Sequence, residues 1–306
     1  MNLIQRNRNN WLDIAKGIAI ILMVMGHTTI PRVAFDFIYS FHMPLFFIAS
    51  GFTSNYAKRS PLEYSGHKAR TILLPFMTYS IIVSILLYAI GKMDFSHLIA
   101  NGWEGYALWF IPVLYFASVI AMLANVVGRR FRYACMLCLF LLGYGLCYFN
   151  VHLPWTLSTV PYATFLVLVG NELKHIQKWI EAENHYCDIA LLFIVTATIS
   201  QFYRLDMAWN HISPVIPLTI GAITGTLMAF RVSVLIERHI KWCASLLQKI
   251  GRETYIVVVF SQVTILYINH FLAINPILKY ALLVAILVLL KYAKDGINRL
   301  VKLKIL

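Results

Sequence analysis

Ten apolar segments make up most of the chain, and most of them come close to the length needed to cross a lipid bilayer. A helix needs about 20 mostly apolar residues to span about 30 Å of hydrocarbon. Of the 306 residues, 60% are hydrophobic and only 13% charged, far from the mix of a soluble domain. The ten segments are residues 11–30, 34–54, 70–91, 105–127, 133–149, 154–171, 187–204, 211–230, 253–273 and 276–293. They predict an all-α polytopic membrane helix bundle of about ten transmembrane helices, with nine or eleven as alternatives, forming a single domain over residues 1–306.

The basic residues fall on alternate loops between these segments. With both termini inside, 21 of the 26 lysines and arginines lie in cytoplasmic segments and four lie outside. Because lysine and arginine accumulate in cytoplasmic loops, the sequence predicts that both termini are cytoplasmic. The net charge of +13 is then explained by loop ends facing anionic membrane lipid, so we expect no nucleic-acid partner.

Neither a cleavable signal nor a metal motif is indicated. Residues 1–10 are a polar, basic lead-in, and the first apolar segment follows without a cleavage site, so we expect the first helix to be retained. Two of the five cysteines, Cys135 and Cys138, have C-x-x-C spacing, but no matching Cys or His pair lies nearby in the sequence. We interpret the cysteines as small core residues and expect no metal.

The first apolar segment carries three ionisable groups, Asp13, Lys16 and His27, in the stretch DIAKGIAIILMVMGH. Lys16 and His27 are eleven residues apart, which places them on one helix face about 16 Å apart along the axis. Asp13 is one turn before Lys16, close enough to pair with it. A charge inside a span normally faces the bundle interior and marks a functional path. The alternative is an interfacial Asp13–Lys16 pair and a hydrogen-bonded histidine at the helix end.

The second segment favours the functional interpretation. Its stretch SFHMPLFFIASGF places His42 at a depth comparable with that of His27 on an antiparallel neighbour, which suggests a site. Pro44 and Gly51 are interpreted as kink and close-packing residues, whereas Ser50 adds a hydroxyl.

Lys68 and Arg70 lie where the third segment begins, just before LLPF. On spacing alone they indicate only topology. Together with Lys16 they would ring the cytoplasmic end of the bundle, where a phosphate-bearing ligand could be held.

In their order, these stretches and LWFIPVLYF, residues 108–116, resemble the acyltransferase-3 family of integral membrane acyltransferases, in its fucose 4-O-acetylase-like branch. The resemblance implies a membrane O-acyltransferase in the bacterial cytoplasmic (inner) membrane. Such an enzyme takes an acyl group, usually acetyl, from cytoplasmic acyl-CoA and places it on a hydroxyl of a cell-surface or lipid-linked sugar. Acetyl-CoA is then a consumed co-substrate, and the acceptor is a carbohydrate or lipid-linked glycan.

The basic-x10-His motif of the family falls on Lys16 and His27, and its basic cluster falls on Lys68 and Arg70. Lysine in place of the more usual arginine keeps the charge but loses the bidentate fork. A larger departure is at Ser261 and Gln262, where many relatives have a histidine, so that histidine's role cannot be transferred.

The resulting hypothesis assigns a role to each group. His27 is the general base, or a transient acyl carrier, since histidine can itself be the nucleophile. His42 or Ser50 supplies the oxyanion donor. Asp13 is about 21 Å from His27 by helical rise and so positions Lys16 instead. The cations that bind CoA phosphates are Lys16, Lys68 and Arg70. Trp109 lines the channel or stacks on a sugar, or else belongs to the interfacial aromatic belt.

A transporter or flippase for a sugar or lipid-linked glycan is the alternative function. Ten spans with intramembrane charges suit it too, but no internal repeat is visible and the polar groups cluster in the first three segments. A membrane scaffold without chemistry would leave the alignment of Lys16 with His27 unexplained.

Overall fold

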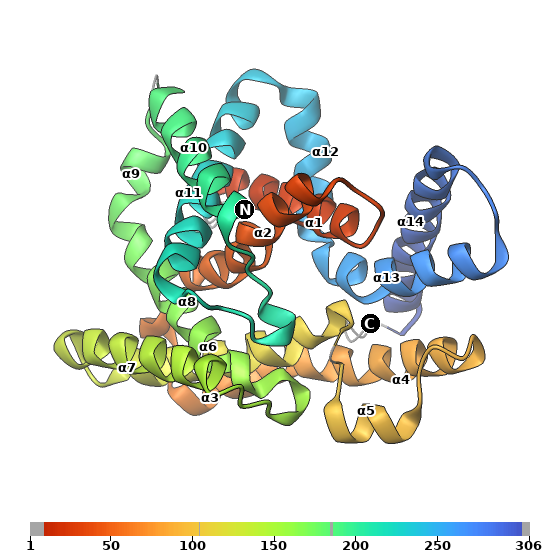
Figure 1. The fold of residues 1–306 in the computed structure, drawn as a ribbon, viewed down its shortest axis with the longest axis horizontal. Helices are drawn as coiled ribbons and strands as arrows, with labels where there is room; N and C mark the ends of the chain where they lie inside the picture. Colours follow the sequence, from red (N-terminus) through yellow and green to blue (C-terminus); the bar gives the residue numbers. More distant parts are fainter. Residues whose placement is uncertain (1–8, 104, 184–185, 302–306) are drawn as a thin grey trace.

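The computed structural model describes residues 9–103, 105–183 and 186–301, and these residues fold almost entirely into helices (Figure 1). Within the described residues the β-structure is limited to one isolated bridge, between Asp206 and His211. The helices are α1 Asn10–Gly26, α2 Arg32–Thr53, α3 Pro61–Lys68, α4 Leu74–Ala89, α5 Phe95–Asn101, α6 Phe110–Val126, α7 Arg129–Tyr148, α8 Val160–Glu172, α9 Gln177–Ile180, α10 Tyr186–Phe202, α11 Val215–His239, α12 Lys241–Arg252, α13 Thr254–Phe271 and α14 Pro276–Val301.

Seven helical segments among the described residues are long and apolar enough to cross a membrane: α2, the run from α3 to α4, α6 with the turn before it, α7, α11, α13 and α14. Each of the ten predicted segments coincides with a helix, but three of these helices are short. α1 and α10 have 17 residues and α8 has 13, fewer than the roughly 20 that a straight crossing requires. The seven long apolar segments make the chain a multi-pass membrane protein. Because three of the ten predicted helices are short, the number of ten crossings stays a prediction.

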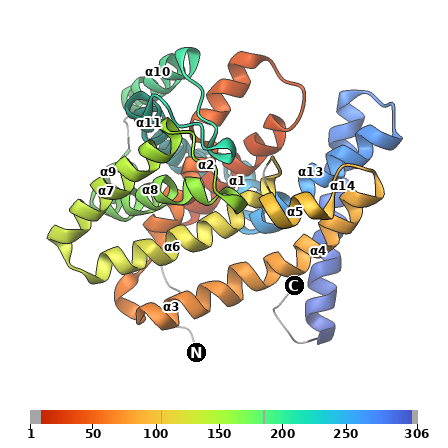
Figure 2. The ribbon, with the colours of Figure 1, turned by 60° about the horizontal axis from the view of Figure 1, so that its bottom comes forward.

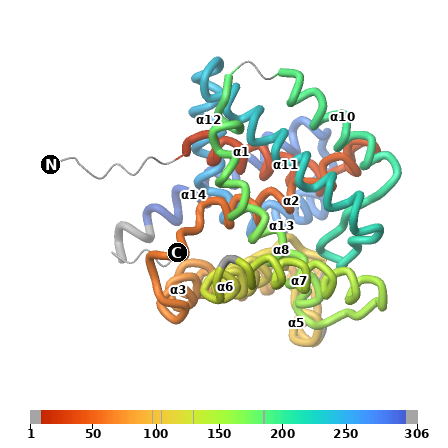
Figure 3. The backbone as a smooth tube through the Cα atoms, turned by 90° about the vertical axis from the view of Figure 1, so that its left-hand side faces the viewer, coloured from red at the N-terminus to blue at the C-terminus, as the bar shows by residue number. Residues whose placement is uncertain are grey.

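α1 and α2 lie in the interior, whereas α7 and α14 lie at the edges (Figures 1 and 2). α2 packs against α8, α11, α1 and α10, and only 6% of the apolar window of α7 or of α14 is buried. α1 begins and α14 ends on the same side of the molecule in Figure 3. Following the predicted orientation, we call this side the inner end and the opposite side the outer end.

Glycines allow the interior helices to approach each other closely. A Cβ atom on Gly51 of α2 would overlap the carbonyl oxygen of Val167 in α8, and one on Gly170 would overlap that of Ile48. Small residues at helix contacts are typical of membrane bundles, where close approach gives van der Waals packing. The contact fixes α2, which carries His42, against α8 and agrees with the packing role predicted for Gly51.

The run from α3 to α4 begins at Pro61, nine residues before the predicted start at 70 (Figure 2). Ser60 and Glu63 form a reciprocal capping box, and Pro61 occupies the first turn. A π-helical turn, Ala69–Leu73, joins the two helices. The segment is thus helical through Lys68 and Arg70, which hydropathy alone does not indicate because residues 58–70 are polar.

Two loops at the outer end are held to the bundle by polar contacts. Gln262 of α13 accepts from the amide of Ala107 at 2.7 Å and donates to the carbonyl of Gly105 at 3.2 Å. In the second loop, the hydroxyl of Thr159 donates to the carbonyl of Met207 at 2.8 Å. These contacts fix the backbone of residues 105–109 and 204–209 above the ends of α1 and α2.

Candidate functional site

A cavity of about 180 Å³, here called the outer cavity, lies beneath the two loops. It brings together three of the predicted site residues, His27, His42 and Trp109. Its wall also contains Met23, Tyr39, Met43, Phe46, Gly105, Tyr106, Ala107, Phe110, Arg204, Leu205, Asp206, Met207, Ala208, Trp209 and Val258. The two imidazoles that the sequence placed at similar depths therefore share one cavity.

His27 and His42 reach this cavity from different backbone positions. α1 ends at Gly26, so His27 is the residue that caps the helix rather than a residue within it. His42 lies inside α2, is 3% exposed, and has its Nδ1 2.8 Å from the carbonyl oxygen of Ile38. A carbonyl only accepts, so this contact requires Nδ1 to carry the proton and leaves Nε2 of a neutral His42 as an acceptor. His42 thus donates to an oxyanion only after it has itself gained a proton.

The loop of residues 204–209 adds groups that the sequence analysis did not identify. Arg204 lies over the rings of Phe35 and Tyr39, at 4.6 and 5.7 Å from their centroids, and its Nη2 is 3.3 Å from Oδ2 of Asp206. Burial raises the pKa of the Asp206 carboxyl, and the charge of Arg204 opposes that rise. A guanidinium, a carboxylate and aromatic rings in one cavity suit a polar ligand with apolar faces. The sequence signal was an Arg–x–Asp pair between two apolar segments.

Trp109 is 4% exposed and faces the bundle interior rather than lipid. It ends the short helical turn Ala107–Trp109, whose first amide is held by Gln262. Gln262 therefore positions the wall of the outer cavity. Its neighbour Ser261 is buried.

A second cavity, of about 190 Å³ and here called the middle cavity, lies nearer the inner end and contains Lys16 and Ser50. Phe46, Phe110 and Val258 line both the middle and the outer cavity, so these apolar side chains stand between the two. Ser50 is thus placed with Lys16 and not in the cavity of the two histidines.

A third cavity, of about 710 Å³ and here called the inner cavity, adjoins the middle cavity at Lys16 and Thr53. Nζ of Lys16 is 2.7 Å from Oδ1 of Asp13, the predicted pairing, and Nε of Arg252 is 3.4 Å from Oδ2 of the same carboxylate. Two further lysines line this cavity, Lys58 and Lys174. The inner cavity is therefore rich in cations, with one buried carboxylate that orients Lys16.

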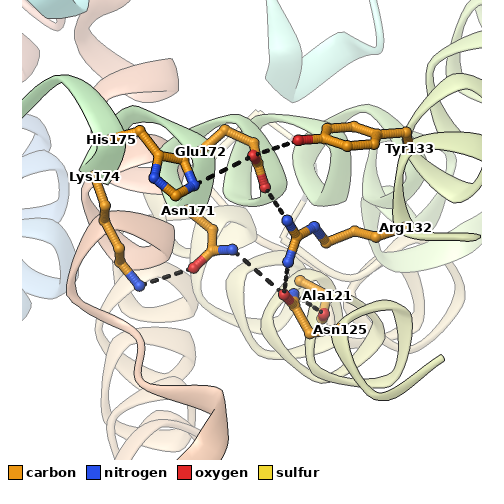
Figure 4. Close-up of polar contacts among 8 residues, drawn as sticks. All are labelled: Ala121, Asn125, Arg132, Tyr133, Asn171, Glu172, Lys174 and His175. Atoms are coloured by element: carbon orange, nitrogen blue, oxygen red, sulfur yellow. Dashed lines mark hydrogen bonds and ion pairs between the residues drawn. The ribbon is translucent and has the colours of Figure 1, made fainter. Parts of the chain in front are cut away.

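Figure 4 shows how Lys174 is held. Its Nζ donates to the carbonyl of Ser54 and, at 2.8 Å, to Oδ1 of Asn171. A chain of contacts continues through Asn125 to Arg132, whose Nη2 is 2.7 Å from Oε1 of Glu172. Burial lowers the pKa of the Lys174 ammonium, Glu172 raises it and Arg132 lowers it. The network presents Lys174 to the inner cavity from the ends of α6, α7 and α8.

Lys68 and Arg70 line none of these three cavities. The ammonium of Lys68 lies 5.6 Å from the ring centroid of Tyr64, and Arg70 is exposed. The cations that share a cavity with Lys16 are instead Lys58, just after α2, and Lys174, just after α8. Both were counted among the predicted cytoplasmic basic residues, but a single sequence does not say which loop lysines fold toward α1.

Comparison with known proteins gives one family. A family model described as an acyltransferase domain matches residues 9–294 of the chain, which is nearly its whole length. No curated protein and no solved structure matches it.

Proposed function

The chain belongs to this family of acyltransferase domains, and we propose that it is an acyl-CoA-dependent O-acyltransferase of the bacterial cytoplasmic membrane. In this proposal it moves an acyl group, acetyl foremost, from acyl-CoA at the inner end to a sugar hydroxyl at the outer end.

One observation carries the proposal: three cavities follow one another from the inner to the outer end. The inner and middle cavities share Lys16 and Thr53, and the middle and outer cavities share Phe46, Phe110 and Val258. The series begins at the pair Asp13–Lys16 and ends at His27 and His42. A long, thin acyl donor with an anionic head fits this order of charge, apolar wall and imidazole.

The inner cavity supplies the groups for the anionic head of CoA. Lys16, Lys58 and Lys174 would bind its phosphates as point charges, with Asp13 keeping Lys16 in place. Lys68 and Arg70, assigned to CoA by the resemblance, would act outside this cavity, at the approach to it. The pantetheine arm would then occupy the middle cavity, past Ser50, and bring the thioester to the apolar partition.

The outer cavity supplies the groups for acceptor and chemistry. Trp109 and Trp209 would stack their rings on a sugar. Arg204 would donate hydrogen bonds to the sugar hydroxyls, and Asp206 would accept hydrogen bonds from them. The acceptor oxygen attacks the thioester carbonyl carbon while His27 removes its proton, and the C–S bond then breaks. The leaving thiolate takes up a proton and departs as CoA. His42, once protonated, can donate from Nε2 to the developing oxyanion.

In a two-step variant, His27 attacks the thioester and carries the acyl group before the sugar oxygen displaces it. A single turnover with labelled acetyl-CoA and no acceptor separates the two routes. Label that stays on the wild-type protein and is absent from His27→Ala supports the carrier. Label that never stays on the protein supports direct transfer.

The proposal is tested by release of CoA from acetyl-CoA by the purified protein, with sugar acceptors added. We expect His27→Ala to abolish release and Lys16→Ala to weaken donor binding. His152→Ala and Lys92→Ala are matched controls, because both residues are exposed and line none of the three cavities. If wild type and both site variants release no CoA with any acceptor, the enzyme proposal fails and transport of a sugar or lipid-linked glycan takes its place.

A further inference from the structure

A fourth cavity lies on the other side of His27, between the end of α1 and the pair α13–α14, and is here called the lateral cavity. Its volume is about 520 Å³, and besides His27 its polar lining residues are Thr28, Thr29, Asn269, Lys279 and Tyr280. His27 lines both this cavity and the outer cavity. The imidazole proposed as base or acyl carrier therefore stands at a boundary between two spaces.

The polar groups of the lateral cavity include one cation and two separate hydrogen-bonded pairs. Nζ of Lys279 is 2.7 Å from Oδ1 of Asn269, and the hydroxyl of Tyr280 is 2.5 Å from Oγ1 of Thr28. Lys279 is the only lysine or arginine in the lining, which contains no carboxylate, and no ion pair joins Lys279 to a described acidic residue. An unneutralised ammonium with hydroxyl and amide neighbours favours an anionic ligand, and a phosphate in particular.

α14, whose first turn lines the cavity, lies at the edge of the bundle (Figures 1 and 2). α14 is a peripheral helix with 6% of its apolar window buried, and its first turns expose Ile277 at 82% and Leu278 at 51%. Apolar side chains exposed to this degree on a membrane helix face lipid. A ligand that reaches Lys279 beside α14 thus has access from the bilayer, which a lipid chain needs.

From these contacts we propose that the lateral cavity binds the phosphate of a lipid-linked acceptor. The phosphate lies at Lys279, the lipid chain runs outward along α14, and the attached sugar passes His27 into the outer cavity. This assignment rests on the proposed acyl transfer for its purpose, but the binding of a lipid phosphate stands by itself. It names the acceptor class as an anionic, membrane-anchored sugar.

The test measures binding of farnesyl diphosphate, a single-chain lipid diphosphate, to the full-length protein in detergent by native mass spectrometry. Farnesol has the same chain without the charge. We expect wild type to bind the diphosphate and not the alcohol. Lys279→Gln should weaken binding about tenfold, the loss of one charge-assisted contact, and Lys279→Arg should retain it. Lys92→Gln removes an outer-end lysine away from the cavity and should change nothing.

Two further arms identify the source of the phosphate and exclude a folding defect. Dioleoyl phosphatidylglycerol added in equimolar amount should not displace farnesyl diphosphate; equal displacement would mean a general lipid headgroup site and overturn the proposal. Ile265→Trp should fill the cavity and reduce binding with Lys279 intact, whereas Ile277→Trp, on the lipid face, should not. Unchanged binding in Lys279→Gln also overturns it. Binding without any CoA release would instead leave the phosphate site in place and reject the acyltransferase proposal.

Discussion

Gln262 and Ala107 are joined across 155 positions of sequence by a hydrogen bond of 2.7 Å, in which the amide of Ala107 donates to Oε1 of the side chain. The other end of the same side chain, Nε2, donates to Gly105. Gln262 thereby holds the backbone of the outer-cavity wall on both sides of Tyr106. The position is thus structural here, and its chemistry is that of an amide.

Replacing Gln262 should loosen that wall. Gln262→Leu removes both hydrogen bonds and leaves the amide of Ala107 without its partner, which costs about 1–3 kcal/mol for a buried donor. We expect a lower thermal midpoint in detergent and slower acyl transfer. Gln262→Glu keeps the acceptor for Ala107 but replaces the donor to Gly105 by an oxygen that repels the carbonyl, so its midpoint should also lie below that of wild type. Equal midpoints for all three proteins would contradict the positioning role.

Lys16 should affect donor binding more than the chemical step. Lys16→Ala removes a cation from the inner cavity, and we expect KM for acetyl-CoA to rise about tenfold, with a smaller change in kcat. Lys16→Arg should retain most of the affinity. Asp13→Asn weakens the pairing that orients Lys16 and should give a smaller rise in KM. A fall in kcat alone for Lys16→Ala would place Lys16 in the chemistry instead.

Phe46 should control passage from the middle to the outer cavity. It lines both cavities and is 7% exposed, so Phe46→Trp adds bulk at the partition. We expect acyl transfer to fall while CoA still binds at the inner cavity, measured by isothermal titration. Phe116→Trp is the matched control, because Phe116 is 41% exposed and lines neither cavity. Unchanged acyl transfer in Phe46→Trp would show that Phe46 does not stand in the path of the acyl group.

Asp206 should make stability depend on pH. Burial raises the pKa of its carboxyl above the ordinary value of 3.8, so the native state holds the proton more tightly than the unfolded chain does. The resulting stabilisation is present below pH 3.8 and is lost as pH rises through the higher native pKa. Asp206→Asn has no such titration. The thermal midpoint of wild type should therefore fall relative to that of Asp206→Asn over this window, and parallel curves would contradict the assignment.

Gly51 should tolerate no side chain. A Cβ there overlaps the carbonyl oxygen of Val167, and because backbone cannot rotate away, Gly51→Ala should cost about 3 kcal/mol or more. Gly66 is the control, since a Cβ added there meets nothing within 4 Å in an exposed helix. Gly66→Ala should stabilise by about 0.5–1 kcal/mol. Thermal midpoints of the two variants in detergent check both signs.

Much of the helical framework follows from hydropathy, because each helix that faces lipid must be apolar over most of its length. The predicted start of the third helical run was nine residues too late. Residues 61–70 are mostly polar, and their helix depends on the capping box of Ser60 and Glu63. That signal, S-x-x-E, was present in the sequence. The lengths of α1 and α8 could not be predicted, because loops and lipid-facing neighbours decide where such helices end.

The candidate site was predictable in its helical part. Lys16 lies on α1, His27 directly follows α1, and His42 lies on α2. One short loop makes the two helices antiparallel neighbours, so the depths of these residues could be compared from the sequence. Arg204, Lys58 and Lys174 come from loops and helix ends, and nothing in a single sequence says where such a segment folds back. Ser50 has a different reason: it follows His42 by eight residues on α2, about 12 Å along the helix, and so lies in the middle cavity rather than beside His42.

The partition of Phe46, Phe110 and Val258 has a consequence for the cell as well as for the reaction. A hole through a bundle of this kind would let protons and sodium flow down their gradients, since water in a continuous column conducts ions. Here three apolar side chains lie between the middle and outer cavities, and an apolar partition of this kind would interrupt such a column. In the proposed reaction, an acetyl group, small and uncharged, would pass this partition at the tip of the pantetheine arm, so acyl transfer would proceed without discharging the membrane potential.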